Sequence, residues 1–185
     1  MSINLKIQAD ERMLKDVEER LGSMKFKARN VLNSALNRAL TNADANLRKE
    51  IRRDYNVAAG AIKGASKRRK STTSTLGAEL KINGRPLGID KFKVTPKTVN
   101  GNRRKPLKAT VKKGRTASLG DSFVANLNGI KIFKRRGVKQ YPIDRIFSVS
   151  IPQMADDTAI VEQVQKEANL MFLKRVEHEI SRLLA

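Results

Sequence analysis

The chain has 185 residues and a formal net charge of +21, with 39 Lys and Arg residues against 18 Asp and Glu residues. Hydrophobic residues make up 39% of it and aromatic residues 4%, which predicts a lean core and a protomer that relies on burial against neighbouring chains. Cysteine is absent, so disulfides, a thiolate nucleophile and a cysteine-based metal site are excluded.

The positive charge is concentrated in the middle of the chain. Residues 1–54 carry +4, residues 55–155 carry +19 and residues 156–185 carry −2. A segment with this excess is expected to face phosphate, an acidic partner or bulk water.

The N-terminal part predicts a short strand followed by two helices. The strand is INLKI, and a helical period begins at Ala9 and ends at Gly22. Residues 24–54 predict one long Ala-rich helix whose apolar residues recur at spacings of three and four, with Ser23 as its cap. Its many alanines suit the close approach of another helix.

A weaker, glycine-interrupted helix follows and leads into the basic block KRRK at 67–70. The polar tract STTST comes directly after this block. Together they predict a mobile segment.

Three Asn-Gly dipeptides, at 83–84, 100–101 and 128–129, predict type I′ hairpins in an antiparallel meander. Two-residue loops at these positions would bring apolar residues opposite each other. The expected pairs are Leu80 with Leu87, Val94 with Leu107, and Leu127 with Ile130. The stretch 112–121 predicts a flexible loop.

The C-terminal part predicts an extended segment and then a helix. Tyr141-Pro142 favours extended backbone, and IFSVSI is expected to form a final strand or an extended arm. An amphipathic helix is expected from about Asp156 to the C-terminus.

These elements predict an α+β fold, in which a meander sheet packs with the long helix and the C-terminal helix. One domain is expected over 1–185, with a mainly helical part (1–70), a β-rich basic part (76–151) and the C-terminal helix (155–185).

The residues give no support for an enzyme or for a cofactor. His178 lies between two glutamates on the last helix, where a solvated position is expected rather than a general base, and no nucleophile can be assigned to it. No phosphate-binding or metal-binding motif occurs. No secretory signal or membrane span is predicted, which favours a soluble protein made in a cytoplasm.

The basic segment is the candidate functional surface, facing either nucleic acid or an acidic partner. Few aromatic residues accompany the cations, so only non-specific nucleic-acid binding is expected. Lys112, Lys113 and Arg115 form a further cluster. The principal candidates are Lys67, Arg68, Arg69, Lys70, Arg103, Arg104, Lys105, Lys134, Arg135 and Arg136.

The order of features is similar to that of a known family. The long Ala-rich helix is followed by AELKINGRPLGIDKF, then SFVANLNGIKIFKRRG, YPIDRIFSVSIPQM and the terminal helix. This order resembles the minor tail protein Z family of long-tailed bacteriophages, also called tail completion proteins. The likeness is closest over 122–185 and is one of pattern over 24–95.

The resemblance implies a structural virion protein at the head-proximal end of the tail, made in the host cytoplasm and needed for head–tail joining. It implies a ring of identical copies, expected to be hexameric, and no catalytic residues. The expected partners are the tail terminator or tail tube protein, the head connector proteins and, through non-specific contact, the DNA end. The expected assembly arm consists of Tyr141, Pro142, Ile143, Ile151 and Pro152. A free-standing, non-specific nucleic-acid-binding protein is the alternative.

Overall fold

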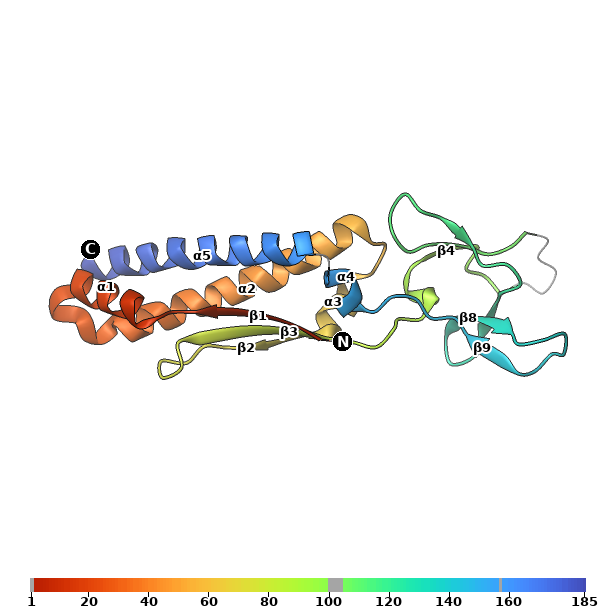
Figure 1. Ribbon diagram of the computed structural model, residues 1–185, viewed down its shortest axis with the longest axis horizontal. Helices are drawn as coiled ribbons and strands as arrows, with labels where there is room; N and C mark the ends of the chain where they lie inside the picture. The colour runs from red at the N-terminus through yellow and green to blue at the C-terminus, as the bar shows by residue number, and fades with distance from the viewer. Residues whose placement is uncertain (1, 100–104, 157) are drawn as a thin grey trace.

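The computed structural model describes residues 2–99, 105–156 and 158–185, and the molecule is elongated (Figure 1). One end is a helical body, formed by residues 2–85 together with the described residues of 151–185. The other end is a smaller β lobe, formed by the described residues of 86–150. The predicted α+β class is confirmed.

The helices of the body begin close to the predicted positions. Asp10 caps α1 (Glu11–Leu21) by accepting a hydrogen bond from the Met13 amide at 2.8 Å. Gly22, with φ of 53°, ends this helix as predicted. The 3₁₀ segment η1 (Gly22–Lys27) follows, and α2 (Ala28–Asp54) begins after it. The prediction of Ser23 as the cap of α2 is wrong, because η1 lies between them.

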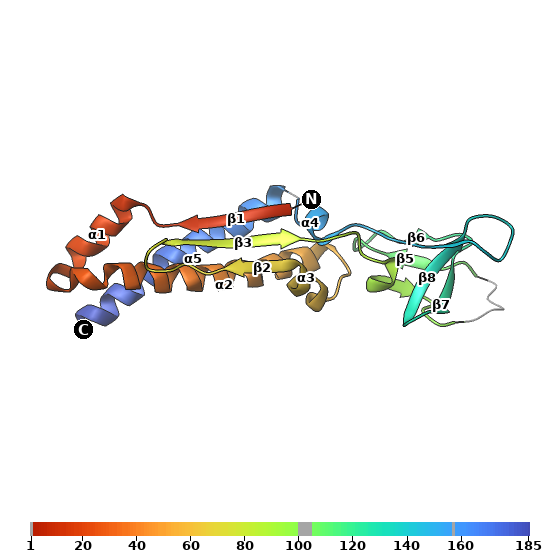
Figure 2. The ribbon, with the colours of Figure 1, turned by 90° about the horizontal axis from the view of Figure 1, so that it is seen from below.

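The long helix α2 packs along the C-terminal helix α5 (Thr158–Leu184) over much of its length (Figures 1 and 2). Ala35, Ala39 and Ala43 of α2 are each at most 2% exposed. Small side chains let the helices come close, as predicted, while leucines on the same helix fill the core.

The first sheet covers the other side of α2, with β3 (Gly77–Asn83) between two outer strands, β1 (Ser2–Gln8) and β2 (Ser66–Arg69). Leu80 lies opposite Leu5 in β1, not opposite Leu87. The predicted hairpin at 83–84 is therefore wrong. The reason is burial: β1 brings the buried Leu5 and Ile7 to this sheet, whereas Leu87 remains half-buried elsewhere.

Two small meanders form the β lobe. The first contains β4 (Lys93–Thr95), β5 (Lys108–Thr110) and β6 (Ala117–Ser118), and the stretch predicted as a flexible loop supplies β6. Val94 lies opposite Ala109 rather than Leu107, so the predicted register is wrong by two residues and the same side chains still share a face. The Asn-Gly dipeptide at 100–101 lies outside the described residues.

The second meander contains β7 (Phe123–Asn126), β8 (Ile130–Arg135) and β9 (Ile143–Arg145). The hairpin at 128–129 is confirmed, and Asn128 and Gly129 both have positive φ. Its register is wrong by one residue, because Asn126 rather than Leu127 pairs with Ile130. The loop thus has one more residue than a two-residue type I′ turn.

The C-terminal helical region begins earlier than predicted. Ser150 caps the short helix α4 (Ile151–Ala155) in a capping box with Gln153, and Pro152 occupies its first turn. Asp156 ends α4 instead of starting the last helix.

The two segments through which the chain enters and leaves the lobe are hydrogen-bonded to each other at its base. Ser148 donates to the carbonyl of Leu87 at 2.7 Å, and Ile89 donates to that of Ile146 at 3.0 Å. The end of α2 forms a second connection, in which Lys113 donates to the carbonyl of Asp54 at 2.7 Å. The bond to Asp54 holds the lobe against the end of α2.

An exposed ion pair joins α1 to α5, and it gives a pH-dependent prediction. Arg20 Nη1 donates to Glu177 Oε1 at 2.8 Å, and this hydrogen bond lowers the pKa of Glu177 below its ordinary value. Replacing Glu177 by Gln is expected to reduce stability by at most about 1 kcal/mol at pH 7, because exposed pairs are screened by water.

The difference between wild type and Glu177→Gln should vanish in acid. A carboxylate with a lowered folded-state pKa contributes stability above its unfolded-state pKa and loses it as pH falls through the folded-state value. Thermal unfolding between about pH 7 and 2, with the exposed Glu162→Gln as control, measures this. A difference that persists at the acid end would contradict the assignment.

Candidate functional site

The basic block at 67–70 forms most of strand β2 at the edge of the first sheet, so its prediction as a mobile segment is wrong. Lys67, Arg69 and Lys70 are exposed. Arg68 Nε lies 3.8 Å from Oδ2 of Asp44, a buried carboxylate on α2. Arg48 and Ser66 also bond to Asp44, each at 3.0 Å. Arg68 is therefore part of the contact between the sheet and α2.

The block Lys134–Arg136 lies at the end of β8 in the lobe. Arg136 donates two hydrogen bonds to Asp144, at 2.8 and 2.9 Å, which lower the pKa of that carboxyl. The Arg135 guanidinium lies 4.9 Å from the centre of the Phe123 ring, within cation–π range. All three cations are exposed, and two of them, Arg135 and Arg136, also interact within the lobe.

The other predicted cations are Arg103, Arg104 and Lys105. Arg103 and Arg104 lie outside the described residues, and Lys105 is exposed beside them. In the part of the chain that the structure describes, β2 runs along the helical body whereas β8 lies in the lobe (Figures 1 and 2). The blocks at 67–70 and 134–136 therefore lie on separate parts of the molecule.

The predicted assembly arm is divided between two environments. Tyr141 and Pro142 are exposed in the β8–β9 loop, and Ile143 is half-buried at the start of β9. Ile151 and Pro152 are buried in α4, so within a single chain they are not exposed for contact with a partner. The Ser150 cap starts a helix whose apolar residues pack into the core of the same chain.

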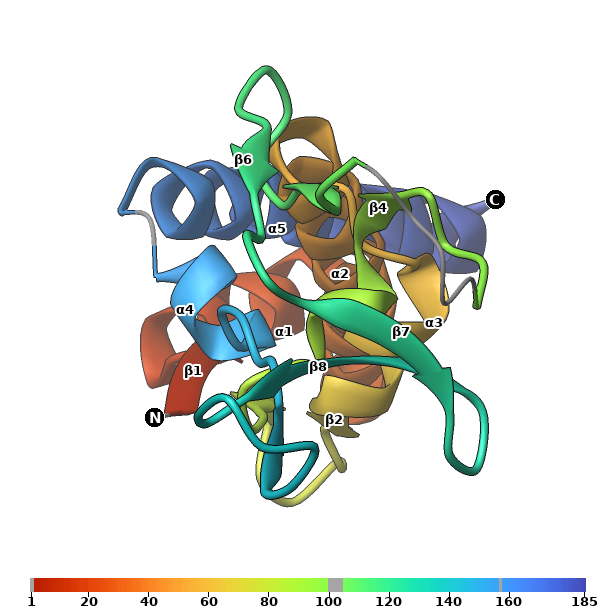
Figure 3. The same cartoon turned by 90° about the vertical axis from the view of Figure 1, so that its right-hand side faces the viewer.

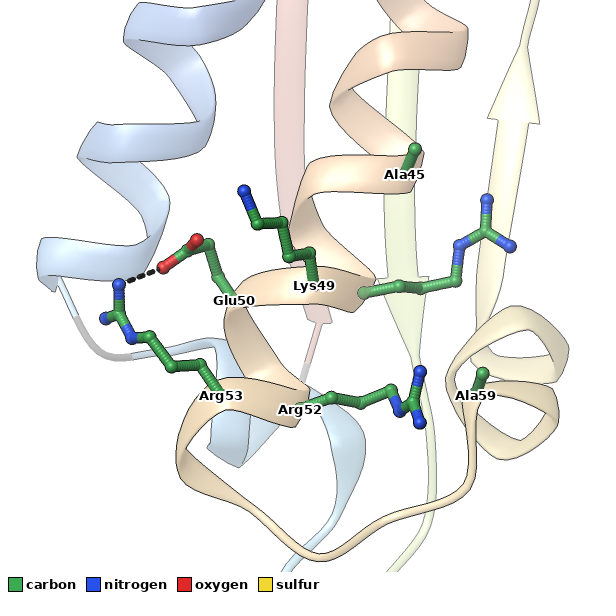
Figure 4. A pocket seen from close by; sticks show the side chains of 7 residues that line it. Ala45, Lys49, Glu50, Arg52, Arg53 and Ala59 are labelled. Carbon is green, nitrogen blue, oxygen red and sulfur yellow. Dashed lines mark ion pairs between the residues drawn. The ribbon is translucent and has the colours of Figure 1, made fainter.

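The structure gathers other cations where the helical body meets the β lobe. One open pocket of about 580 Å³ is lined by the last turns of α2 and the start of α3 (Ala59–Ala65) (Figure 4). Glu50 and Arg53 point to one side of α2 and form an ion pair of 2.5 Å, while Arg52 points to the other side, toward Ala59. The lining residues are Ala45, Arg48, Lys49, Glu50, Arg52, Arg53 and Ala59.

A second pocket, of about 410 Å³, adjoins the first, because Arg52 lines both. Its cations are Arg52 from α2, Lys91 and Lys93 from the start of the lobe, and Lys113 from the segment after β5. The other lining residues are Tyr55, Asn56, Val57 and Phe92, so no carboxylate lines this pocket. We call the two pockets together the junction groove.

Backbone pairing explains why these cations meet. Asn56 donates to the carbonyl of Val111 at 2.9 Å, and Tyr55 and Lys112 form an isolated antiparallel bridge. This contact brings the chain around Lys113 to the end of α2. Figure 3, viewed from the lobe end, shows the lobe strands crossing in front of α2 and α3.

Little in the sequence indicates the junction groove. Arg52 belongs to the polar face of an amphipathic helix. Lys91 and Lys93 are isolated cations in a stretch where polar and apolar residues alternate as in a strand. Lys113 belongs to a cluster identified in the sequence, but the end of α2, to which its backbone is hydrogen-bonded, lies more than 50 positions earlier in the chain. Only contacts between distant segments reveal the groove.

The described residues show no other candidate centre. They contain no group of three His, Asp or Glu side chains that could hold a metal ion, and His178 is exposed. Within the same residues, no helix is long and apolar enough to cross a membrane.

Comparison with known proteins identifies the family. The model of the family described as prophage minor tail protein Z (GPZ) matches residues 13–185, which is nearly the whole chain. Neither the comparison with curated proteins nor the comparison with solved structures finds a match. The chain therefore belongs to the prophage minor tail protein Z family, a family of structural proteins of the phage tail.

Proposed function

We propose that this chain is a tail completion or neck subunit, which acts at the head-proximal end of a phage tail and enables heads to join tails. Family membership over residues 13–185 is the observation that carries the proposal. The subunits would form a ring of identical copies, expected to be hexameric, that contacts the tail terminator or tail tube protein on one side and head connector proteins on the other.

Exposed apolar side chains in the loops of the lobe support an assembly role. The lobe presents two hairpin loops whose apolar side chains are exposed. Val138 is fully exposed and Tyr141 is 68% exposed in the β8–β9 loop, while Leu127 is 51% exposed in the β7–β8 loop. Apolar side chains gathered at loop tips suit contact with another protein.

The basic blocks predicted from the sequence give less support to the alternative function, a free-standing non-specific nucleic-acid-binding protein. Arg68 and Arg136 are paired with carboxylates, and the predicted blocks lie on different parts of the molecule. Sizing in near-physiological salt separates the two functions. A monomer that binds DNA but never associates with tails would favour the alternative.

Replacing Val138 by Asp and Tyr141 by Ala is expected to block head–tail joining while the chain still folds. Both side chains are exposed, so their loss leaves the core intact, but an introduced carboxylate would disrupt an apolar contact. The variant is supplied to a phage that lacks its own copy of the gene. Electron microscopy then counts free tails, free heads and joined particles, and plaque formation measures infectivity.

A matched control is Leu184→Asp, which places a carboxylate on an exposed apolar residue at the far end of the body. Loss of joining in the lobe variant alone supports an assembly role for the β8–β9 loop. Normal yields of infectious particles from the lobe variant would rule that role out. Tails that join heads efficiently when the whole protein is missing would overturn the proposed function itself.

A further inference from the structure

We propose that the junction groove binds the phosphate backbone of double-stranded nucleic acid, without reading its sequence. The site is distinct from the basic clusters predicted from the sequence, since only Lys113 belongs to one of them. It deepens the proposed function by naming a surface through which a neck subunit would contact DNA. The binding itself can be measured whether or not the proposed place in the tail is correct.

The charge of the groove favours a ligand with many negative groups. Seven cations line its two pockets, against the single carboxylate of Glu50, which is paired with Arg53. Arg48 is paired with Asp44. Among the described residues, no carboxylate lies within 4.0 Å of the charged nitrogens of the other five cations, which are Lys49, Arg52, Lys91, Lys93 and Lys113. A small anion would neutralise only some of them, whereas a phosphate backbone presents a charge at every nucleotide.

The lining of the groove favours a duplex over a single strand. Single-stranded nucleic acid is normally held by aromatic side chains on which its bases stack. Phe92 is buried, and Tyr55 is half-buried with the Lys112 ammonium 5.8 Å from its ring centre. No free aromatic face in the groove is therefore ready to accept a base. A duplex keeps its bases stacked inside and presents only phosphate and sugar to such a surface.

The same lining disfavours an acidic protein as the ligand. Binding energy between proteins is concentrated in aromatic or apolar anchors that enter desolvated pockets. Ala45 and Ala59 are the apolar residues of the first pocket, and the apolar residues of the second pocket, Val57 and Phe92, are already buried. A groove lined by cations and without an accessible apolar centre fits a phosphate backbone better than it fits an acidic protein.

The groove is held in position before any ligand arrives. Asn56 Nδ2 donates to the carbonyl of Thr110 at 3.1 Å, in addition to the two backbone hydrogen bonds that join 54–56 to 111–113. These contacts keep the cations of the lobe beside those of α2. Little ordering of the backbone is then needed on binding, which favours affinity.

The test compares two fourfold variants of the full chain that remove the same charge. The site variant carries Arg52→Gln, Lys91→Gln, Lys93→Gln and Lys113→Gln. The control variant carries Lys25→Gln, Arg38→Gln, Lys166→Gln and Lys174→Gln, all exposed positions of the helical body. Binding to a fluorescently labelled DNA duplex of about 30 base pairs is measured by anisotropy at several salt concentrations, and thermal unfolding confirms that both variants are folded.

We expect the site variant to bind roughly 100-fold more weakly than wild type at about 0.1 M salt, and the magnitude of the slope of log affinity against log salt to fall by up to about 3.6, or about 0.9 for each cation removed. The control should retain most of the affinity. Equal losses in both variants, or no loss in the site variant, would overturn the site. If the fourfold variant does not fold, the single changes Lys93→Gln and Lys113→Gln, both at exposed positions, provide the same comparison.

Two competitors test the chemical class of the ligand. Unlabelled single strands should compete less well than the duplex at equal phosphate concentration, and polyglutamate should compete less well at equal charge. Stronger competition by single strands would overturn the duplex assignment. Stronger competition by polyglutamate would identify the groove as a docking surface for an acidic protein. Neither result bears on head–tail joining, which the particle counts measure separately.

Discussion

Replacing Arg145 by methionine is expected to destabilise the protein by about 3–5 kcal/mol, because it leaves a buried carboxylate without its counter-charge. Arg145 Nη2 donates to Asp90 Oδ1 at 2.8 Å, and the Asp90 side chain is only 5% exposed. Methionine is apolar and of comparable length, so the loss of charge is the main change. Denaturant unfolding measures the difference in free energy.

The surroundings show why the pair cannot easily rearrange. A Cβ added at Gly88 would clash with both Arg145 Nη2 and Asp90 Oδ1, so the backbone of Gly88 is in close contact with both partners. This glycine also belongs to the segment that pairs with the chain around Phe147 at the base of the lobe. The ion pair therefore lies in the connection between lobe and body.

Two further variants make the Arg145 result specific. Arg115→Met removes an exposed arginine of the same lobe and should change stability by less than about 0.5 kcal/mol. The double variant Asp90→Leu with Arg145→Met removes both charges and should recover most of the loss. A loss in the single variant no larger than that of Arg115→Met would show that the pair contributes little.

Replacing Leu36 by alanine is the second large effect, with an expected loss of about 3–5 kcal/mol. Leu36 has no exposed surface and lies in α2, the helix that packs against α5 and the first sheet. Removing its side chain loses the transfer free energy of the removed atoms and leaves a cavity, since close-packed neighbours relax only in part. The midpoint of thermal unfolding and the denaturant midpoint both report the loss.

The matched control for Leu36 is Leu173→Ala on α5, where the side chain is 50% exposed. The same atoms are removed there from a partly hydrated position, so a much smaller loss is expected. Similar losses at the two positions would show that α2 is not the centre of the core.

Whether an element could be predicted depends on how far along the chain the residues that determine it are spread. The helices were predictable because capping and apolar periodicity are local: Gly22 ends α1, and the alanines of α2 face a second helix. The turn at 128–129 was predictable for the same reason, since Asn and Gly readily take up the positive φ that it requires. Strand pairing was less predictable, because Leu80 could face Leu87 or Leu5 by apolar matching alone.

The cations of the candidate site show the same difference between what local sequence predicts and what distant contacts decide. Runs of cations in the sequence identified Lys67–Lys70 and Lys134–Arg136. In the structure, Arg68 pairs with Asp44, which is distant in the sequence, and Arg136 pairs with Asp144, which lies across a loop. The cations of the junction groove that face no carboxylate are dispersed in the sequence. The sequence shows how many cations a segment carries. Which of these cations form ion pairs depends on the carboxylates that the fold brings close to them.

The sequence alone determined the α+β class, the positions of the long helices, the positive middle segment and the resemblance to the tail protein family that the comparison then established. These depend on local periodicity, composition and the order of features, which are properties of the chain before it folds. The tertiary structure alone decided the partners of β3, the burial of Ile151 and Pro152, and the junction groove. Each of these depends on competition for burial and on backbone hydrogen bonds between segments far apart in the chain, and no local pattern encodes the result of that competition.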